Sequence, residues 1–269
     1  MHTSPSTIPL RVRVLRSGSA GNAVLVETAG ARVLVDAGLP TDTLLRALHA
    51  AGPTPLAAIL LTHEHDDHAK GAAALARATG APIFLTAATL RACGESLAGV
   101  PHEVVAVDRP FVVGGLEVTP FPVPHDAAEP VGFALARTGT RVVVACDLGE
   151  VTPAVLDHAR GADLLVIEAN YDVGLLAVSP YPWFLKNRIA GPRGHLSNGA
   201  AARAAVAAAT GRPQTVHLVH LSEVNNLAPL ARDLVRAALE AEGLATVRVE
   251  AVRPNAAGPW WPPGSAPAG

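Results

Sequence analysis

A short run between positions 62 and 68 concentrates groups that can bind metal. It reads Thr-His-Glu-His-Asp-Asp-His and directly follows the apolar residues 59–61, which are typical of a buried strand end. Burying so many ionisable groups there without ions or other partners would be costly. We therefore predict a metal site, and the alternative is an exposed polar loop that binds nothing.

Seven potential ligands fall at the ends of predicted strands or in the loops after them. They are His63, His65, Asp67, His68, His125, Asp147 and His220. His63 and His65 are two residues apart in an extended loop and point to the same side, so they can hold one ion. Asp67 and His68 begin the next helix and face a second ion. Asp147 has two oxygens that can bridge the ions, and His125 and His220 complete one ion each.

Imidazole and carboxylate ligands suit Zn²⁺, Mn²⁺ or Fe. A water bridging two such ions is acidified toward neutrality, and the resulting hydroxide can act as the nucleophile without help from a side chain. Asp36 follows a predicted strand and is placed to hold the 63–68 loop by hydrogen bonds outside the ligand shell. A simple strand-end cap is the alternative role for Asp36.

Composition limits the classes of protein to which the chain can belong. Its 269 residues, 49% of them hydrophobic, can bury a substantial core, and the net charge of −2 gives no overall positive field for nucleic acid. Two cysteines, Cys93 and Cys146, fit a reducing compartment. Residues 1–9 lack the pattern of a signal peptide, and no apolar run reaches the roughly 18 residues of a membrane span. We expect a cytoplasmic protein with no membrane segment.

Hydrophobic periodicity predicts two blocks of strands, each followed by alternating strands and helices. We expect strands at 11–16, 22–28, 31–35, 56–61, 82–85, 104–107, 111–113, 116–121, 131–137, 140–145, 163–167, 215–219 and 245–250, and helices at 41–51, 67–79, 87–93, 152–159, 198–209 and 227–242. Two such halves make an α/β fold, an αββα four-layer sandwich of two mixed sheets with helices outside. The predicted catalytic domain is 1–253, and 254–269 is a Pro/Gly/Ala-rich flexible tail that Trp260 and Trp261 could pin to the surface.

The run at 62–68 resembles the His-x-His-x-Asp-His signature of the metallo-β-lactamase superfamily, in the expected order with Asp36, His125, Asp147 and His220. That resemblance implies one ion held by His63, His65 and His125, another held by Asp67, His68 and His220, and Asp147 between them. Stretches 17–22, 167–172, 194–198 and 220–226 are similar to the bacterial WalJ-like (YycJ-like) family. This second resemblance implies a 5′-to-3′ exonuclease acting on DNA.

Glu168 and His195 resemble a Glu and His pair in the phosphodiesterase branch that includes the tRNA 3′-processing ribonucleases. Phosphodiester cleavage needs a proton for the departing alkoxide, so we expect His195 to donate it and Glu168 to orient His195 and favour its charged form. We expect Asp67 to take part in catalysis together with this pair, in addition to binding metal. The alternative is that His195 caps the helix beginning near Ser197.

Substrate contacts are expected from three segments. Residues 181–195 contain Lys186, Arg188 and Arg193 with three aromatics and no acid, which suits a phosphate backbone and a stacked base. An amphipathic helix with its aromatics in the core is the alternative. The loop at 17–22 can present backbone N–H groups to a terminal phosphate, or it is a plain hairpin turn. The residues predicted to bind substrate are Ser19, Asn22, Lys186, Arg188, Ser197 and Asn198.

The leading hypothesis is a two-metal phosphodiesterase that degrades DNA ends in repair or processing. One alternative is a hydrolase of a small phosphodiester, lactone or thioester, and another is an RNA-processing nuclease. A third possibility, a metal-binding module without catalysis, is disfavoured because the ligand set is complete.

Overall fold

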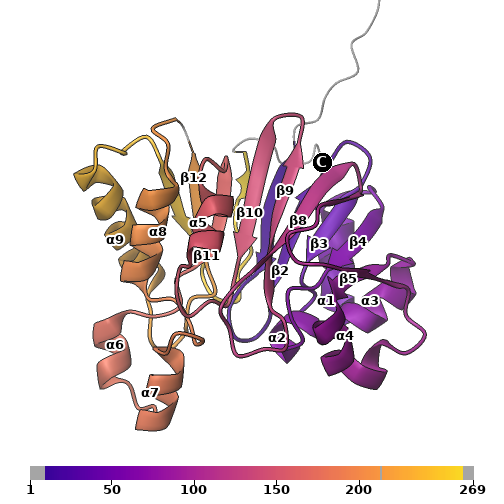
Figure 1. Ribbon diagram of the computed structural model, residues 1–269, viewed down its shortest axis with the longest axis horizontal. Coiled ribbons are helices and arrows are strands. Elements are labelled where there is room, and N and C mark those ends of the chain that lie inside the picture. The colour runs from indigo at the N-terminus through magenta and orange to yellow at the C-terminus, as the bar shows by residue number, and fades with distance from the viewer. Residues whose placement is uncertain (1–9, 213, 263–269) are drawn as a thin grey trace, which may run out of the picture.

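The computed structural model describes residues 10–212 and 214–262, which form two seven-stranded sheets packed face to face (Figure 1). The first sheet has the spatial order β14 (Trp260–Trp261), β1 (Arg11–Arg16), β2 (Ala23–Glu27), β3 (Arg32–Val35), β4 (Leu56–Leu60), β5 (Ile83–Thr86) and β6 (His102–Val105). The second has the order β13 (Arg248–Ala251), β12 (Thr215–Val219), β11 (Leu164–Glu168), β10 (Thr140–Ala145), β9 (Val131–Arg137), β8 (Leu116–Pro122) and β7 (Phe111–Val113).

Helices cover the outer face of each sheet. The first sheet is covered by α1 (Thr41–Ala50), α3 (Ala72–Thr79) and α4 (Ala87–Cys93), which runs into a 3-10 turn at Gly94–Leu97. The second is covered by α5 (Pro153–Ala159), α8 (Asn198–Ala208) and α9 (Ala228–Ala241). Three short helices, α2 (Asp66–Ala69), α6 (Val173–Val178) and α7 (Trp183–Ile189), lie at one edge of the sandwich. The predicted αββα sandwich is confirmed.

Each sheet begins as an antiparallel meander and continues as parallel strands joined by helical crossovers. The central strands are buried on both faces, so they are almost entirely apolar. Alternate residues such as Val24, Val26 and Val144 fill the space between the sheets. Their neighbours, such as Leu25 and Leu165, pack under the helices. This alternation fixes the register that brings the strand ends of both sheets to one edge.

The helix predicted over 67–79 is two helices in the structure, α2 and α3, separated around Gly71. A Cβ on Gly71 would lie 2.1 Å from the carbonyl oxygen of Leu39, and one on Gly38 would lie 1.7 Å from that of Asp67. The chain after β3 therefore packs directly on the backbone of the run at 62–68 that is predicted to bind metal. Backbone hydrogen bonds from Ala37 to His68 and from Gly71 to Ala37 complete this contact.

Smaller differences from the predicted elements occur at the ends of the chain and around the site. Sequence periodicity missed α6, α7 and β14, and it placed β6 and β13 two to three residues away from their observed starts. Trp260 and Trp261 pair with β1 as an edge strand, and Trp261 is buried between the sheets. These tryptophans attach residues 254–262 to the domain. Residues 263–269, the rest of the tail predicted to be flexible, lie outside the described part.

Candidate metal centre

The ends of several strands bring their polar side chains to the same edge of the sandwich. Asp36 and His220 directly follow β3 and β12, Asp147 lies two residues beyond β10, and Glu168 is the last residue of β11. The carboxyl ends of parallel strands face one way, where α/β proteins usually bind their ligands. Asp36, Asp147 and His220 turn the chain sharply there, with φ of 62°, 50° and 53°.

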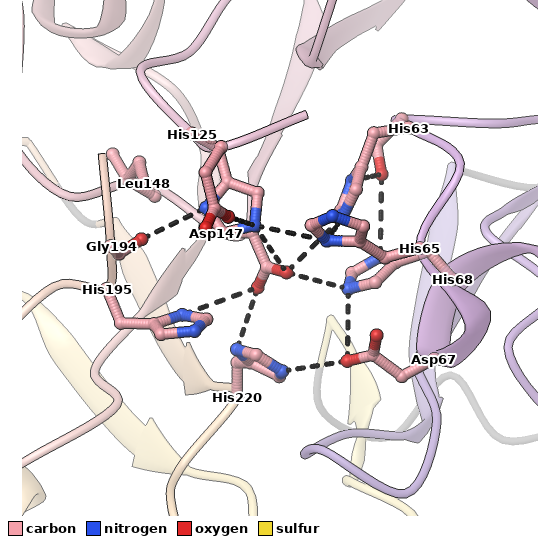
Figure 2. Close-up of polar contacts among 12 residues, drawn as sticks. His63, His65, Asp67, His68, His125, Asp147, Leu148, Gly194, His195 and His220 are labelled. Carbon is pink, nitrogen blue, oxygen red and sulfur yellow. Dashed lines mark hydrogen bonds and ion pairs between the residues drawn. The ribbon is translucent and has the colours of Figure 1, made fainter. Parts of the chain in front are cut away.

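Four of the predicted ligands form a first group around the 63–65 loop (Figure 2). His65 Nδ1 lies 3.1 Å from His63 Nε2 and 3.3 Å from His125 Nε2. Asp147 Oδ2 lies 3.5 Å from His63 Nε2 and 3.6 Å from His125 Nε2. Three imidazole nitrogens and one carboxylate oxygen therefore face a common point.

A second group lies beside the first and shares Asp147 with it. His68 Nε2 is 3.1 Å from Asp147 Oδ2 and 3.6 Å from Asp67 Oδ2. His220 Nε2 is 3.3 Å from the same Asp67 oxygen. Since Asp147 Oδ2 faces both groups, the structure brings all seven predicted ligands into two adjoining sets. Their role as ligands stays a prediction.

The chemistry of these donors fits cations. His68 Nδ1 donates to Asp36 at 2.7 Å, His125 Nδ1 donates to the Gly194 carbonyl at 3.0 Å, and His220 Nδ1 donates to Glu168 at 2.8 Å. In its neutral form, an imidazole that donates through Nδ1 has a bare lone pair at Nε2, so these Nε2 atoms can act as acceptors for a cation at the centre. Acceptors directed at one another beside carboxylates need a positive charge between them.

Asp36 has the contacts expected of a residue that supports the ligands. Its Oδ2 accepts the hydrogen bond of His68, and its Oδ1 accepts from the backbone N–H and the hydroxyl of Thr62, both at 2.9 Å. Asp36 is 2% exposed. It therefore fixes both the start of the metal-binding run and the ring of one predicted ligand, as such outer carboxylates commonly do. These contacts go beyond a simple strand-end cap.

The protonation of the predicted ligands follows from burial and from the nearest charges. Burial and the neighbouring His68 lower the pKa of His63 well below its ordinary value. Burial also opposes protonation of His68 and His220, but Asp147 outweighs it and raises the pKa of both well above the ordinary value. Burial by itself would raise the pKa of Asp147, yet His220 and His68 hold that pKa well below normal. Asp147 is therefore a carboxylate. A cation can take the place of the protons on His68 and His220 and balance this negative charge.

His195 and Glu168 form a pair at the rim of the two groups. His195 Nδ1 donates to Glu168 Oε1 at 2.7 Å, and its ring lies 5.2 Å from that of His220. Glu168 is fully buried, whereas the His195 side chain is 24% exposed. Burial lowers the pKa of His195, but the charge and hydrogen bond of Glu168 outweigh burial and raise it. The pair can therefore hold a proton beside the centre with Nε2 of His195 free.

An open hollow of about 500 Å³ lies over both groups. It is lined by Ser19, Glu64, His65, Asp66, Asp67, His125, Asp147, Arg188, His195 and His220. Of the six residues predicted to contact substrate, this set includes Ser19 and Arg188. The Arg188 side chain is 63% exposed, and its Nε donates to Asp126 at 2.8 Å.

The other four residues predicted to contact substrate do not line this hollow. Asn22 is buried against the metal-binding run, with Nδ2 3.1 Å from His68 Nε2. Lys186 donates to the carbonyl of Ala177 in α6, and Ser197 caps α8. Asn198 is buried and pairs its amide with that of Asn226. Short polar residues at helix starts satisfy backbone or core groups more often than they bind ligands, which explains Ser197 and Asn198.

Sequence reasoning missed two residues that hold His220 in place. The hydroxyl of Ser17 accepts the backbone N–H of His220 at 2.6 Å, and the amide of Asn170 donates to the His220 carbonyl at 2.8 Å. Both belong to stretches singled out in the sequence, but the first contact spans 203 positions. Their place in stretches 17–22 and 167–172 was thus the only sign of a role in the sequence, and it did not reveal their contacts with His220.

Comparison with known proteins places this geometry in a family. Residues 31–221 match the family described as "Beta-lactamase superfamily domain". The exodeoxyribonuclease YycJ of Bacillus anthracis is 35% identical over 240 residues, 87% of this chain and 90% of that protein. The exodeoxyribonuclease WalJ of Streptococcus pneumoniae is 34% identical over 233 residues, 84% of this chain and 87% of that protein.

Solved structures agree on the fold. The metallo-β-lactamase fold protein YhfI of Bacillus subtilis superposes with a TM-score of 0.70 at 19% identity, over 93% of this chain and 98% of that one. Among residues 10–212 and 214–262, no helix is long and apolar enough to cross a membrane. The chain is therefore a metal-dependent hydrolase of the β-lactamase superfamily and belongs to the family that contains the YycJ and WalJ proteins.

Proposed function

We propose that this protein is a phosphodiesterase that removes nucleotides from DNA ends in the 5′-to-3′ direction, in DNA repair or processing. Its relatives YycJ and WalJ carry the name exodeoxyribonuclease and match it over most of their lengths. The observation that carries the proposal is the hydrogen bond between His195 and Glu168 beside two groups of predicted metal ligands, with His195 and members of both groups lining one hollow.

The first group would hold one divalent cation and the second group another, zinc or manganese, with Asp147 between them. When bound, the two cations supply an acidified water molecule as nucleophile and positive charge that offsets the phosphate. Asp67, the most exposed carboxylate of the groups at 23%, faces the hollow and is placed to orient that water.

His195 supplies the proton that the reaction needs. As a P–O bond breaks, the departing sugar oxygen gains a negative charge, and a proton from His195 Nε2 neutralises it. Glu168 keeps His195 charged until that transfer, because its carboxylate accepts the Nδ1–H and is buried away from solvent. Since the rings of His195 and His220 lie 5.2 Å apart, this proton would be next to the two predicted metal-binding groups.

Arg188 is the cation at the hollow that is best placed to contact a phosphate, and Ser19 provides a hydroxyl that also lines the hollow. We place the protein in the cytoplasm, where its substrate would be found and where its two free thiols are stable. Hydrolysis of RNA is the other outcome to be measured, because ribonuclease Z of Bradyrhizobium diazoefficiens is 32% identical over 137 residues.

The test is digestion of end-labelled single- and double-stranded DNA and RNA by protein loaded with Mn²⁺ or Zn²⁺. We expect mononucleotides released from 5′ ends of DNA, and loss of activity with a chelator. His195→Ala should abolish turnover while the metal content stays unchanged, whereas His102→Ala, at an exposed position on β6, should have no effect. Protein that carries metal but releases no nucleotide from any of these substrates would refute the proposal.

A further inference from the structure

Helices α6 and α7 form a small projection, residues 173–189, at the edge of the sandwich where the metal centre lies (Figure 1). Its own core consists of Tyr171, Leu176 and Ile189, with Tyr181 and Leu185 packed against them. Lys186 ties α7 to α6 through its bond to the carbonyl of Ala177. The projection is thus a built element with a defined outer surface.

Two aromatic side chains on that outer surface are exposed to solvent. Trp183 is 77% exposed and Phe184 is 71% exposed. In the part of the chain that the structure describes, they are the only exposed residues among tryptophan, tyrosine and phenylalanine. The alternative of an amphipathic helix with its aromatics in the core does not hold for these two rings, because Leu185 and Ile189 already fill the face of α7 that packs. Large rings left in water at one place usually mark a binding surface.

The exposed rings lie next to the hollow on the same helix as Arg188. Phe184 and Arg188 are four residues apart on α7, so they share one face of the helix about 6 Å apart along its axis. Arg188 lines the hollow and is paired with Asp126, the neighbour of His125. The chain after α7 returns at once to the site, since the N–H of His195 donates to the carbonyl of Ile189 at 2.8 Å.

The charge of this region suits a polyanion. From position 173 to position 222 the chain has no Asp or Glu, while its net charge as a whole is −2. Cationic side chains in that stretch include Arg188 and Arg193, and Arg193 donates to the carbonyl of His125 at the rim of the hollow. Exposed rings on an acid-free stretch of the chain, beside the proposed phosphodiesterase site, match the features of surfaces that bind single strands.

We infer that Trp183 and Phe184 form a stacking platform for unpaired bases of the nucleic-acid strand whose end lies in the hollow. The inference rests on the proposed function and deepens it. Every base has an aromatic face, so such a platform holds a strand without reading its sequence. It would make the protein prefer substrates with an unpaired stretch several nucleotides long over a minimal diester.

The test compares a long and a short ligand. The long one is a 5′-phosphorylated, single-stranded dodecanucleotide with hydrolysis-resistant phosphorothioate linkages, measured by fluorescence polarisation. The short one is bis-p-nitrophenyl phosphate, measured by turnover. For the double variant Trp183→Ala/Phe184→Ala, we expect binding of the long strand to weaken by about tenfold or more, with unchanged turnover of the small diester.

Two control variants test whether the effect needs an aromatic ring and whether it is specific to this surface. Trp183→Phe keeps a ring and should keep most of the affinity for the strand. Val112→Ala removes an exposed apolar side chain, 75% exposed, from β7 on the far edge of the second sheet and should change nothing.

Three outcomes would overturn the inference. If the double variant binds the dodecanucleotide as well as the wild type does, the rings are not a platform, and the proposed function stands. If light scattering shows that the double variant turns an oligomer into a monomer at unchanged affinity, the surface binds a second copy instead. If the wild type hydrolyses the small diester but neither binds nor degrades nucleic acid, the proposed function itself fails, and the inference fails with it.

Discussion

Replacing Glu168 by glutamine removes one negative charge from the most connected side chain of the site. Glu168 Oε1 accepts hydrogen bonds from His195 Nδ1 at 2.7 Å and from His220 Nδ1 at 2.8 Å. Its Oε2 accepts from the backbone N–H groups of Leu148 at 3.0 Å and Leu196 at 3.1 Å. A glutamine has one acceptor oxygen and one NH₂ group. Its oxygen can therefore accept from either the two histidine rings or the two backbone N–H groups, and its NH₂ group faces the other pair of donors.

The size of the effect follows from the bonds that are lost. Each hydrogen bond between a charged group and its partner contributes about 1.5–3 kcal/mol. If the amide keeps the backbone pair, His195 loses its carboxylate, and the stabilisation of its charged form falls by that amount. We therefore expect Glu168→Gln to lower kcat on DNA by about ten- to a hundredfold, since about 1.4 kcal/mol corresponds to a factor of ten.

The pH dependence gives a sharper signature. Glu168 raises the pKa of His195, so the acid form persists to higher pH than in a free imidazole, and activity falls as the pH rises through that raised pKa. Without the carboxylate this pKa falls, so the alkaline limb of the kcat profile should move to lower pH. The assay is kcat against pH at saturating oligonucleotide and metal, with metal content measured by mass spectrometry on the same samples.

Two results would refute this reasoning. An unchanged kcat and an unchanged alkaline limb would show that Glu168 does not act on the proton donor. A loss of activity that added metal fully restores would show that Glu168 acts only through His220, by supporting a ligand. The Glu129→Gln variant is the matched control, because Glu129 is also a carboxylate but does not line the hollow.

Three further predictions concern the surroundings of the site and the core. Asp36→Asn removes the carboxylate that orients His68, so metal affinity, measured by competition with a chelating dye, should fall about 10- to 100-fold; unchanged affinity would exclude this role. Burial lowers the pKa of His217 from 6.5 to about 4, so His217 is neutral in the fold, and its contribution to stability is full above pH 6.5 and lost as the pH falls toward 4. His217→Leu should therefore reduce the acid sensitivity of the unfolding free energy by about 3 kcal/mol, and parallel pH profiles of the two proteins would contradict this. Gly71→Ala should lower that free energy by about 1–3 kcal/mol in chemical denaturation because its Cβ would meet a backbone oxygen at 2.1 Å, whereas Gly30→Ala, with nothing within 4 Å, should be nearly neutral.

The fold and the convergence of the seven candidate ligands could be predicted because both depend on short-range patterns. Strands buried on both faces are continuous apolar runs, and a polar residue that follows such a run must lie at the edge of the sheet. Asp147 and His220 each follow a run of this kind. Their convergence then needs only the rule that parallel strands end on the same side.

Contacts that depend on tertiary packing could not be predicted. Ser17 and His220 meet only because β1 and β12 belong to facing sheets, and nothing in either segment indicates the other. The exposure of Trp183 could not be predicted either, because an amphipathic pattern does not say which face finds a partner. The break at Gly71 depends on the close approach of a segment more than thirty positions away.

The backbone conformation supplies an argument for function that the side chains alone do not. Asp36, Asp147 and His220 each have a positive φ, a conformation uncommon for residues other than glycine and costing about 1–3 kcal/mol at such a position. Glycine would relieve that cost but would remove the carboxylate or imidazole. The turn at His220 is held by the hydroxyl of Ser17, and that at Asp36 by a backbone bond to Leu60 at 2.9 Å. At these three strand ends, the positive φ directs the side chains inward at a cost in stability.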